Sequence, residues 1–340
     1  MPQATEPTVV SLTPAEVLDP VHERLRADLA PFALVTAERT HHHGVLEAAA
    51  DADYLIGDWM QEVAIDAELL DHAVRCLAVF QPTAGTNVVD VEHAASLGIP
   101  VANAPGANAR AVAEWVVMAI LAMLKDVWRY HADVLAGKWE MLEAGRTGVY
   151  ELGDRTVGII GMGRIGQDVA ARLAGFELRR IVYTDVVAAP TEVERRFGLE
   201  PVEIDELCRV SDAVTVHVPL LPSTRGLLDA RRLALMSPQT VIVNAARGPI
   251  IDEAALCQAL DAGRLRGVAL DVFTVEPLPM DSPLRGRPNV LLSPHLAGST
   301  NEARHGMMSS ALRNLDRVLR GGAPEHVVNR VEGMPRRGRG

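Results

Sequence analysis

The sequence predicts an α/β protein built from two doubly wound, parallel-sheet domains. At 340 residues the chain exceeds the length of about 250–300 residues at which a single core usually stops growing. Short apolar runs alternate with helical patterns along most of the chain, as expected for parallel sheets with helices on both faces. Residues 156–185 also follow the strand–turn–helix–strand order of a βαβ unit.

Composition and charge exclude several classes of protein. A net charge of −11 argues against a nucleic-acid or anionic-membrane surface. Cys76, Cys208 and Cys257 lie far apart, so neither a disulfide framework nor a zinc site is expected, and a reducing cytoplasm fits. Residues 1–10 lack the features of a signal peptide. Residues 115–124 form an apolar run too short to span a bilayer, which predicts a buried helix.

The N-terminal third predicts a parallel sheet of its own. Its expected strands are 9–10, 33–35, 54–56, 77–79 and 100–102, with helices near 20–30, 44–50, 66–73 and 91–97. Three adjacent histidines at 41–43 have no acidic or cysteine neighbour in sequence, so a solvated turn is expected there and not a metal site. Residues 108–129 predict a long apolar helix that is capped by Asn108 and links the two domains.

The loop at residues 81–86 is rich in small residues and follows a predicted strand. Such loops at the carboxyl edge of a parallel sheet are where ligands bind, although a tight turn without a ligand gives the same pattern.

The glycine-rich segment predicts a dinucleotide site. Gly161 permits the tight strand-to-helix turn, Gly163 lets backbone approach a pyrophosphate, and Gly166 lets the helix pack on the strand. Asp185 follows about 20 residues later, where it would accept hydrogen bonds from the ribose hydroxyls and repel a 2′-phosphate, so NAD is expected in preference to NADP. A purely structural glycine turn is the alternative. The residues predicted here to bind the cofactor are Gly161, Gly163, Arg164, Ile165, Gly166 and Asp185.

Further strands are expected at 157–160, 181–183, 214–216, 241–243, 267–270 and 290–292, with helices at 232–236, 252–261 and 301–319. The basic tail at 336–340 is expected to be disordered.

Three polar residues near these strand ends could converge. A histidine paired with a carboxylate makes a tuned acid/base, because the carboxylate fixes the ring tautomer and raises the pKa of the imidazole. His295 and Glu276 could form such a pair, and Arg247 offers a planar fork for a substrate carboxylate. Each also has a plain alternative, since Arg247 could form a surface ion pair, Glu276 could be an ordinary loop acid and His295 a structural histidine. No serine lies on a G-x-S-x-G elbow, which disfavours a nucleophilic triad.

Four motifs in order resemble the D-isomer-specific 2-hydroxyacid dehydrogenases. They are the segments 161–166 with Asp185, 244–248, 269–277 and 293–295, and the likeness covers nearly the whole chain. Segments 85–90 and 98–105 are most similar to the D-3-phosphoglycerate dehydrogenase branch.

The resemblance implies a Rossmann coenzyme domain, residues 105–298, inserted into a flavodoxin-like substrate domain formed by residues 1–104 and 299–340. It also implies a cleft between the domains and a homodimer built mainly on the coenzyme domains. Arg247 would bind the substrate, His295 would be the general acid/base and Glu276 its partner. Ala84, Gly85 and Asn108 would help to hold the substrate, Asp271 would meet the nicotinamide amide, and the coenzyme pocket would be lined by His217, Val218, Pro219, Thr224 and Ala245.

Two departures from the phosphoglycerate branch affect the expected substrate. The loop after the third strand carries Asp58, Trp59 and Met60 where those enzymes carry a basic residue, and an acidic, apolar loop would repel a phosphate. The chain also leaves no room for the appended regulatory domain. A small or partly apolar 2-oxo acid is therefore expected. Phosphite oxidation would need a lysine near Ala84, and none is present.

Two other functions stay open at this point. One is phosphoglycerate dehydrogenase itself. The other is an NADH-responsive binding protein like the corepressors that share this fold, which is disfavoured because no long disordered tail or peptide-docking extension is found.

Overall fold

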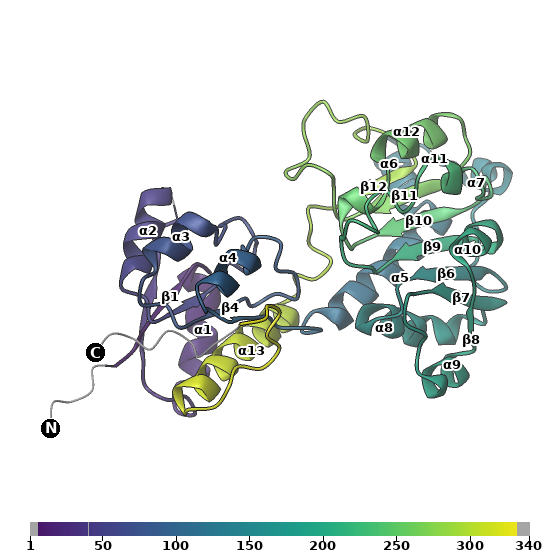
Figure 1. Ribbon diagram of the computed structural model, residues 1–340. Coiled ribbons are helices and arrows are strands. Elements are labelled where there is room, and N and C mark those ends of the chain that lie inside the picture. Colours follow the sequence, from purple (N-terminus) through teal and green to yellow (C-terminus); the bar gives the residue numbers. More distant parts are fainter. Residues whose placement is uncertain (1–5, 40, 332–340) are drawn as a thin grey trace, which may run out of the picture. The chain divides into compact units, whose positions relative to one another are not determined.

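The computed structural model describes residues 6–39 and 41–331. The basic tail at 336–340 lies outside the described residues. The chain divides into two compact units, which are described separately below (Figure 1). Unit 1 comprises Met1–Asn108 and Asn301–Gly340, and unit 2 comprises Ala109–Thr300.

Unit 1 is a parallel sheet with helices on it. Its strands are β1 (Thr8–Ser11), β2 (Ala33–Thr36), β3 (Tyr54–Ile56), β4 (Ala78–Phe80) and β5 (Val101–Ala102). Its helices are α1 (Ala15–Leu25), α2 (His42–Ala50), α3 (Ala67–His72), α4 (Val91–Ser96) and α13 (Asn301–Leu319). The strand order β2-β1-β3-β4-β5, parallel throughout, is the flavodoxin-like order, which confirms the predicted fold. The C-terminal helix α13 packs beside α1 (Figure 1).

Two sequence-based expectations in unit 1 are wrong. The first helix begins at Ala15 and not near residue 20, because Leu18, Val21 and Leu25 form the helical face that is buried. The histidines at 41–43 were expected to lie in a solvated turn with no acidic partner. Instead His42 and His43 begin helix α2, and each contacts a glutamate. His43 contacts Glu47 one helical turn further along α2 (3.0 Å), and His42 contacts Glu68 of α3 (3.2 Å), a partner distant in sequence.

Unit 2 holds the larger sheet. Its strands are β6 (Thr156–Ile160), β7 (Arg180–Thr184), β8 (Leu199–Pro201), β9 (Ala213–Val216), β10 (Val241–Asn244), β11 (Gly267–Leu270) and β12 (Val290–Leu292). Its helices are α5 (Ala109–Lys125), α6 (Val127–Leu135), α7 (Met141–Thr147), α8 (Arg164–Leu173), α9 (Thr191–Phe197), α10 (Ile204–Val210), α11 (Ala230–Leu233) and α12 (Glu253–Asp261), with short 3₁₀ turns at Ala174–Phe176 and Gly248–Ile250.

The strand order of the larger sheet indicates where a ligand would bind at its edge. The strands run β12-β11-β10-β9-β6-β7-β8, all parallel, which is the Rossmann order extended by one strand. The chain moves outward from β6 in one direction and then returns to β9 on its other side. Ligands of such sheets bind at this reversal, so the loops after β6 and β9 are the first place to look.

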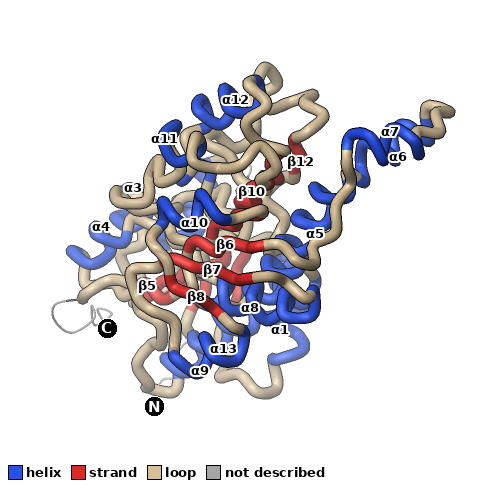
Figure 2. Tube along the Cα trace, turned by 90° about the vertical axis from the view of Figure 1, so that its right-hand side faces the viewer, coloured by secondary structure: helices blue, strands red, loops and turns tan. Residues whose placement is uncertain are grey.

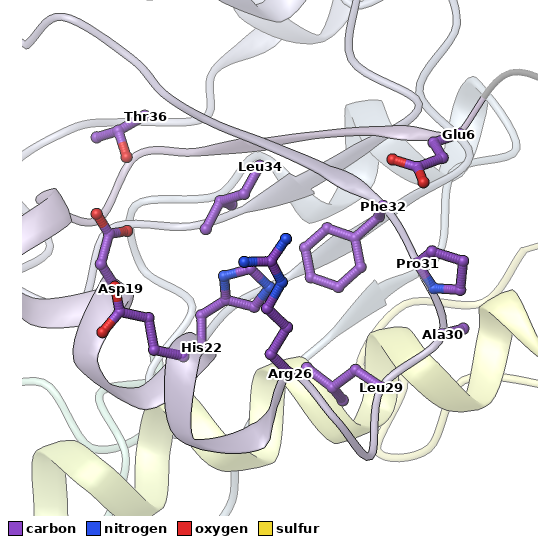
Figure 3. Close-up of a pocket in the computed structure, with 11 residues that line it drawn as sticks. Glu6, Asp19, His22, Arg26, Leu29, Ala30, Pro31, Phe32, Leu34 and Thr36 are labelled. Carbon is purple, nitrogen blue, oxygen red and sulfur yellow. The ribbon is translucent and has the colours of Figure 1, made fainter.

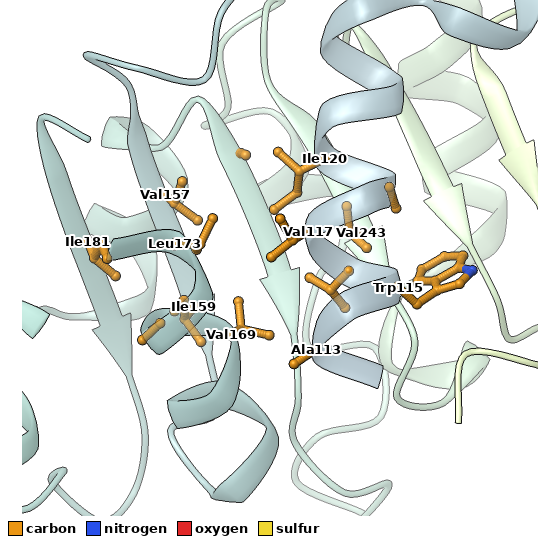
Figure 4. Close-up of a cluster of buried hydrophobic side chains, with 14 of the residues drawn as sticks. Ala113, Trp115, Val117, Ile120, Val157, Ile159, Val169, Leu173, Ile181 and Val243 are labelled. Carbon is orange, nitrogen blue, oxygen red and sulfur yellow. The ribbon is translucent and has the colours of Figure 1, made fainter. Parts of the chain in front are cut away.

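Helices α5 and α8 pack side by side on one face of this sheet and bury its largest core cluster (Figure 4). Val117 and Ile120 of α5 meet Val169 and Leu173 of α8 and the strand residue Val243. Each fully buried aliphatic side chain contributes about 1.5–3 kcal/mol, so this layer fixes the position of α8 and of the glycine loop before it.

The predicted long helix at 108–129 is interrupted. Asp126 adopts a left-handed conformation with φ of 54°, so α5 ends at Lys125 and α6 begins in a new direction. No residue of α6 is buried, and Figure 2 shows α6 and α7 projecting from the sheet of unit 2. Across residues 6–39 and 41–331, no helix combines the length and apolarity needed to cross a membrane.

Candidate active site

The glycine loop after β6 needs its glycines for space. Gly161 has φ of 96°, and a Cβ there would lie 2.8 Å from the His217 carbonyl carbon. A Cβ on Gly166, in the first turn of α8, would lie 2.2 Å from the Gly161 carbonyl oxygen. Both glycines therefore permit close backbone contacts, which the predicted tight turn at Gly161 and the predicted helix–strand packing at Gly166 require.

Gly163 differs from its neighbours. It precedes α8, and a Cβ there would meet nothing within 4 Å in the protein. The fold itself therefore does not need glycine at this position. The open space lies beside the N-terminus of α8, where a pyrophosphate would bind, and a side chain at residue 163 would fill part of that space. Arg164 and Ile165 form the first turn of α8, with Arg164 exposed and Ile165 half-buried.

Asp185 stands at the end of β7 beside this loop. Its carboxylate accepts hydrogen bonds from the Met162 N–H (2.6 Å) and the Val187 N–H (3.2 Å), and the residue is exposed. The acid is thus held next to the glycine loop and faces solvent, where ribose hydroxyls would reach it. These residues fit NAD.

The loop after β9 forms the other side of the strand reversal. The His217 N–H donates to the Ile160 carbonyl (2.7 Å), and His217 Nε2 lies 2.7 Å from Thr215 Oγ1. Burial lowers the pKa of His217 to about 3, so the ring is neutral at physiological pH. Thr224 Oγ1 donates to the Pro219 carbonyl (2.6 Å) and accepts from the Leu221 N–H (2.8 Å), which closes the turn that follows Val218.

The loop after β10 carries Arg247. Asn244 is buried and holds the loop through the Ala246 N–H and the Arg247 carbonyl, both at 3.0 Å, while Ala245 packs against the core beneath. A Cβ on Gly248 would lie 2.0 Å from the Phe273 carbonyl carbon, so only glycine lets this loop touch the segment that leads to Glu276.

Glu276 and His295 form a direct pair. His295 Nδ1 lies 2.7 Å from Glu276 Oε2, and Glu276 Oε1 accepts from the Phe273 N–H (2.8 Å). Because the carboxylate only accepts, Nδ1 carries the proton and Nε2 is left to exchange one with a ligand. The two residues come from different loops and are both partly exposed.

The charge state of this cluster follows from its surroundings. Burial raises the pKa of Glu276, but hydrogen bonds from His295 and Phe273 and the charges of His295 and Arg247 outweigh it, so the net pKa is lowered and the group is ionised at neutral pH. Burial also lowers the pKa of Arg247, against which the Glu276 charge acts. Arg247 remains a cation at neutral pH.

Asp271 holds the loop that carries His295. It is 1% exposed, and its carboxylate accepts from Ser293 Oγ (2.6 Å), the Leu296 N–H (2.8 Å) and the Ala297 N–H (2.8 Å). The Asp271 carbonyl accepts from the His295 N–H (2.8 Å). His295 itself has φ of 52°, a conformation that costs a non-glycine residue energy and that these bonds maintain. A nicotinamide amide that reaches Asp271 would donate its N–H to this same carboxylate, in addition to the three donors already present.

Two of the substrate-binding residues predicted in unit 1, Ala84 and Gly85, would contact a substrate through backbone N–H groups. Ala84 and Gly85 follow β4, where Asn103 Nδ2 donates to the Ala84 carbonyl (2.7 Å) and Thr83 Oγ1 to the Gly85 carbonyl (2.8 Å). Within the described part of the chain, neither the Ala84 nor the Gly85 N–H donates to another residue. Asn108 lies directly before α5.

Sequence reasoning missed several residues that position the candidate site residues within each unit. Ser293 and Gly248 lie inside the motifs at 293–295 and 244–248, but only their contacts in the structure show what each residue does. Asn103 lies inside segment 98–105, but its bond to the Ala84 carbonyl joins residues 19 apart in sequence and could not be predicted from that segment.

A pocket of about 430 Å³ also lies in unit 1, where His22 of α1 and Arg26, which directly follows α1, face Phe32 and Leu34 (Figure 3). None of the predicted site residues lines it.

Comparison with known proteins gives a consistent family. The model of the D-isomer specific 2-hydroxyacid dehydrogenase NAD-binding domain matches residues 117–297. The chain is 37% identical over 317 residues to a D-3-phosphoglycerate dehydrogenase of Methanocaldococcus jannaschii, covering 92% of this chain but only 59% of that protein. It is 38% identical over 275 residues to a glyoxylate reductase of Thermofilum pendens, covering 78% of each.

Solved structures agree with these relatives. D-mandelate dehydrogenase of Rhodotorula graminis superposes with a TM-score of 0.87 at 27% identity, covering 97% of this chain and 100% of that one. The chain belongs to the D-isomer-specific 2-hydroxyacid dehydrogenase family, and NAD is its cofactor.

Proposed function

We propose that the protein interconverts a D-2-hydroxy acid and its 2-oxo acid, with His295, Glu276 and Arg247 as the reacting cluster. The observation that carries this proposal is the 2.7 Å contact between His295 Nδ1 and Glu276 Oε2. The charge of Arg247 also interacts with Glu276 and lowers the pKa of that carboxyl group. Relatives named as dehydrogenases and reductases of such acids support it.

Each residue has a chemical task. Arg247 binds the substrate carboxylate with its planar fork. His295 Nε2 gives a proton to the oxygen on C2 during reduction and takes it back during oxidation, while Glu276 holds the ring and stabilises its charged form. Hydride for C2 is what NADH supplies when bound. In unit 1, the N–H groups of Ala84 and Gly85 provide donors for the substrate carboxylate.

The structure changes one argument about the substrate. Asp58, expected to repel a phosphate, is fully buried and accepts from Arg39 Nη2 (2.9 Å) and from the N–H groups of Met60, Glu62 and Val63. Its charge is compensated inside unit 1, so it does not exclude an anionic substrate. We propose a small 2-oxo acid; glyoxylate reductases are among the relatives.

We also propose a homodimer formed by unit 2. Large apolar side chains are exposed along α6, α7 and the segment between them, including Leu135 (75%), Trp139 (81%) and Met141 (78%). A contiguous exposed apolar stretch of this kind is typical of an interaction surface. Sedimentation of the purified protein, compared with a Trp139→Glu variant, tests this assignment.

Oxidation of NADH against a panel of 2-oxo acids tests the proposed reaction. We expect turnover of at least one acid, little with NADPH, and a loss of kcat of about 10²–10⁴-fold in His295→Asn with NADH binding retained. Turnover that survives in this variant would show that His295 is not the acid/base. NADH binding without turnover on any acid would point to the binding-protein alternative.

A further inference from the structure

Unit 1 contains a cation that no carboxylate neutralises. Arg304, in the first turn of α13, is half-buried, and its described hydrogen bond goes to the neutral side chain of Asn301. Its Nε is buried without a hydrogen-bond partner. No ion pair to Arg304 occurs among residues 6–39 and 41–331. A cation near a helix N-terminus also opposes the helix dipole, so its position in the first turn of α13 is unfavourable for the helix itself.

Arg304 stacks on an aromatic ring from a distant part of the sequence. Its guanidinium carbon lies 5.7 Å from the centre of the Trp59 ring. Trp59 belongs to the loop after β3, and its indole Nε1 is also buried without a partner. The Nε–H of Arg304 and the Nε1–H of Trp59 therefore both lack an acceptor, and leaving such donors unsatisfied is costly.

This pair lies beside the loop that we assign to the substrate carboxylate. Gln81 Nε2 donates to the Asp58 carbonyl (3.0 Å) and to Thr83 Oγ1 (2.9 Å), so it ties the Trp59 loop to the segment that leads into Ala84. Helix α13 contacts β4, which precedes that segment. Both loops leave the carboxyl edge of neighbouring parallel strands.

Nearby charges do not cancel Arg304. The Asp58 carboxylate accepts from Arg39 and three backbone N–H groups, and Glu62 also pairs with Arg39 (3.2 Å). Both acids near Trp59 are thus already occupied by a different arginine. An oxygen anion arriving beside Trp59 would meet an uncompensated guanidinium.

We propose that Arg304, supported by Trp59, binds a second oxyanion at the far end of the 2-oxo acid. The substrate class is therefore a 2-oxo acid that carries a carboxylate or a phosphate beyond C2, not one with a plain alkyl end. This inference rests on the proposed function, because it concerns the other end of the same substrate.

The kinetic test compares acids that differ in this group. Oxaloacetate and 3-phosphonooxypyruvate carry the second anion, whereas 2-oxobutyrate does not. We expect the wild-type ratio of kcat/KM for the preferred anionic acid over 2-oxobutyrate to fall about 10–100-fold in Arg304→Gln, since one charge-assisted contact is lost. Arg313→Gln, an exposed arginine on the same helix, is the matched control and should keep the ratio. The preferred acid identifies the oxyanion.

A binding measurement separates this inference from the reaction itself. Malonate, an unreactive dicarboxylate, should change the tryptophan emission of the wild type but not of Trp59→Phe, and Arg304→Gln should weaken its binding about tenfold or more. Acetate serves as the single-anion control. Malonate binding that depends on Arg304 without turnover of any acid would overturn the proposed function alone. Turnover whose substrate ratio ignores Arg304 would overturn the subsite alone.

Discussion

The two units hold their predicted site residues in different ways. In unit 2 the candidate residues bind one another through side chains before any ligand is present, as the contacts of Glu276 with His295 and of Asp271 with the His295 loop show. In unit 1 the residues predicted to bind the substrate, Ala84 and Gly85, offer backbone N–H groups, and the loop is held by Asn103 and Thr83.

We expect this difference to separate residues that act in the chemical step from residues that act in substrate binding. A side chain that is fixed by several hydrogen bonds can place a proton accurately, so changes in unit 2 should act on kcat. Backbone donors in a loop bind any carboxylate of suitable size, so changes in unit 1 should act on KM and on substrate choice. Changes at Asp271 and Asn103 test this distinction directly, and changes at the glycines after β6 and at His217 test how unit 2 is stabilised.

Among residues outside the reacting cluster, the largest effect is expected at Asp271. Replacement by Asn introduces an amide N–H₂ where three donors now converge, which would release the His295 loop from its left-handed conformation. We expect kcat to fall about 10–100-fold, as for a misplacement of about 1 Å. NADH affinity, measured by fluorescence titration, should change little. Ser293→Ala removes one of the donors and should give a smaller loss. A large loss of NADH affinity with normal kcat would assign Asp271 to the cofactor alone.

Substitutions at two glycines of the segment after β6, Gly163 and Gly166, should distinguish an effect on folding from an effect on cofactor binding. A Cβ at Gly166 would lie 2.2 Å from a backbone oxygen, so Gly166→Ala should lower the unfolding temperature. Gly163→Ala meets nothing in the protein and should unfold normally. It should nevertheless weaken NADH binding about tenfold, or about 1.4 kcal/mol, if pyrophosphate approaches there. Equal unfolding temperatures for the two variants would contradict this distinction.

Acid should weaken unit 2 through His217. Its pKa is about 3 when folded and 6.5 when unfolded, so the unfolded state binds the extra proton between these values and stability falls as pH drops below 6.5. At pH 5 the loss is about 2 kcal/mol, at 1.36 kcal/mol per pH unit. Hydrogen exchange at pH 7 and pH 5 measures this in each unit. His217→Gln should reduce the pH dependence of unit 2, and an unchanged dependence would exclude His217 as its source.

The smallest effect is expected at Asn103. Asn103→Ala removes the side-chain amide that donates to the Ala84 carbonyl at 2.7 Å, which loosens the loop without removing an N–H donor. We expect KM for the 2-oxo acid to rise about 2–10-fold, the value of one ordinary hydrogen bond of 0.5–1.5 kcal/mol, with kcat nearly unchanged. A drop in kcat instead would show that unit 1 also takes part in the chemical step.

Much of the fold was predictable because the patterns are local. The strands at 54–56, 267–270 and 290–292 and the helix at 301–319 have the bounds expected from apolar periodicity. The segments 191–197, 199–201 and 204–210 were not identified, since each is at most seven residues long and too short to show a clear apolar period. The break at Asp126 was missed because an apolar pattern continues across it and only the backbone shows the left-handed residue.

The sequence by itself determined the two parallel sheets, the glycine loop with Asp185, and the identity of the Arg247, Glu276 and His295 set, because spacing along strands and turns encodes them directly. Tertiary structure alone decided which side chains meet. It bound Asp271 to the loop of His295, buried Asp58 against Arg39 and placed Arg304 over Trp59. These pairings join residues brought together by loops at strand ends, where no local periodicity specifies a partner and packing fixes the distance.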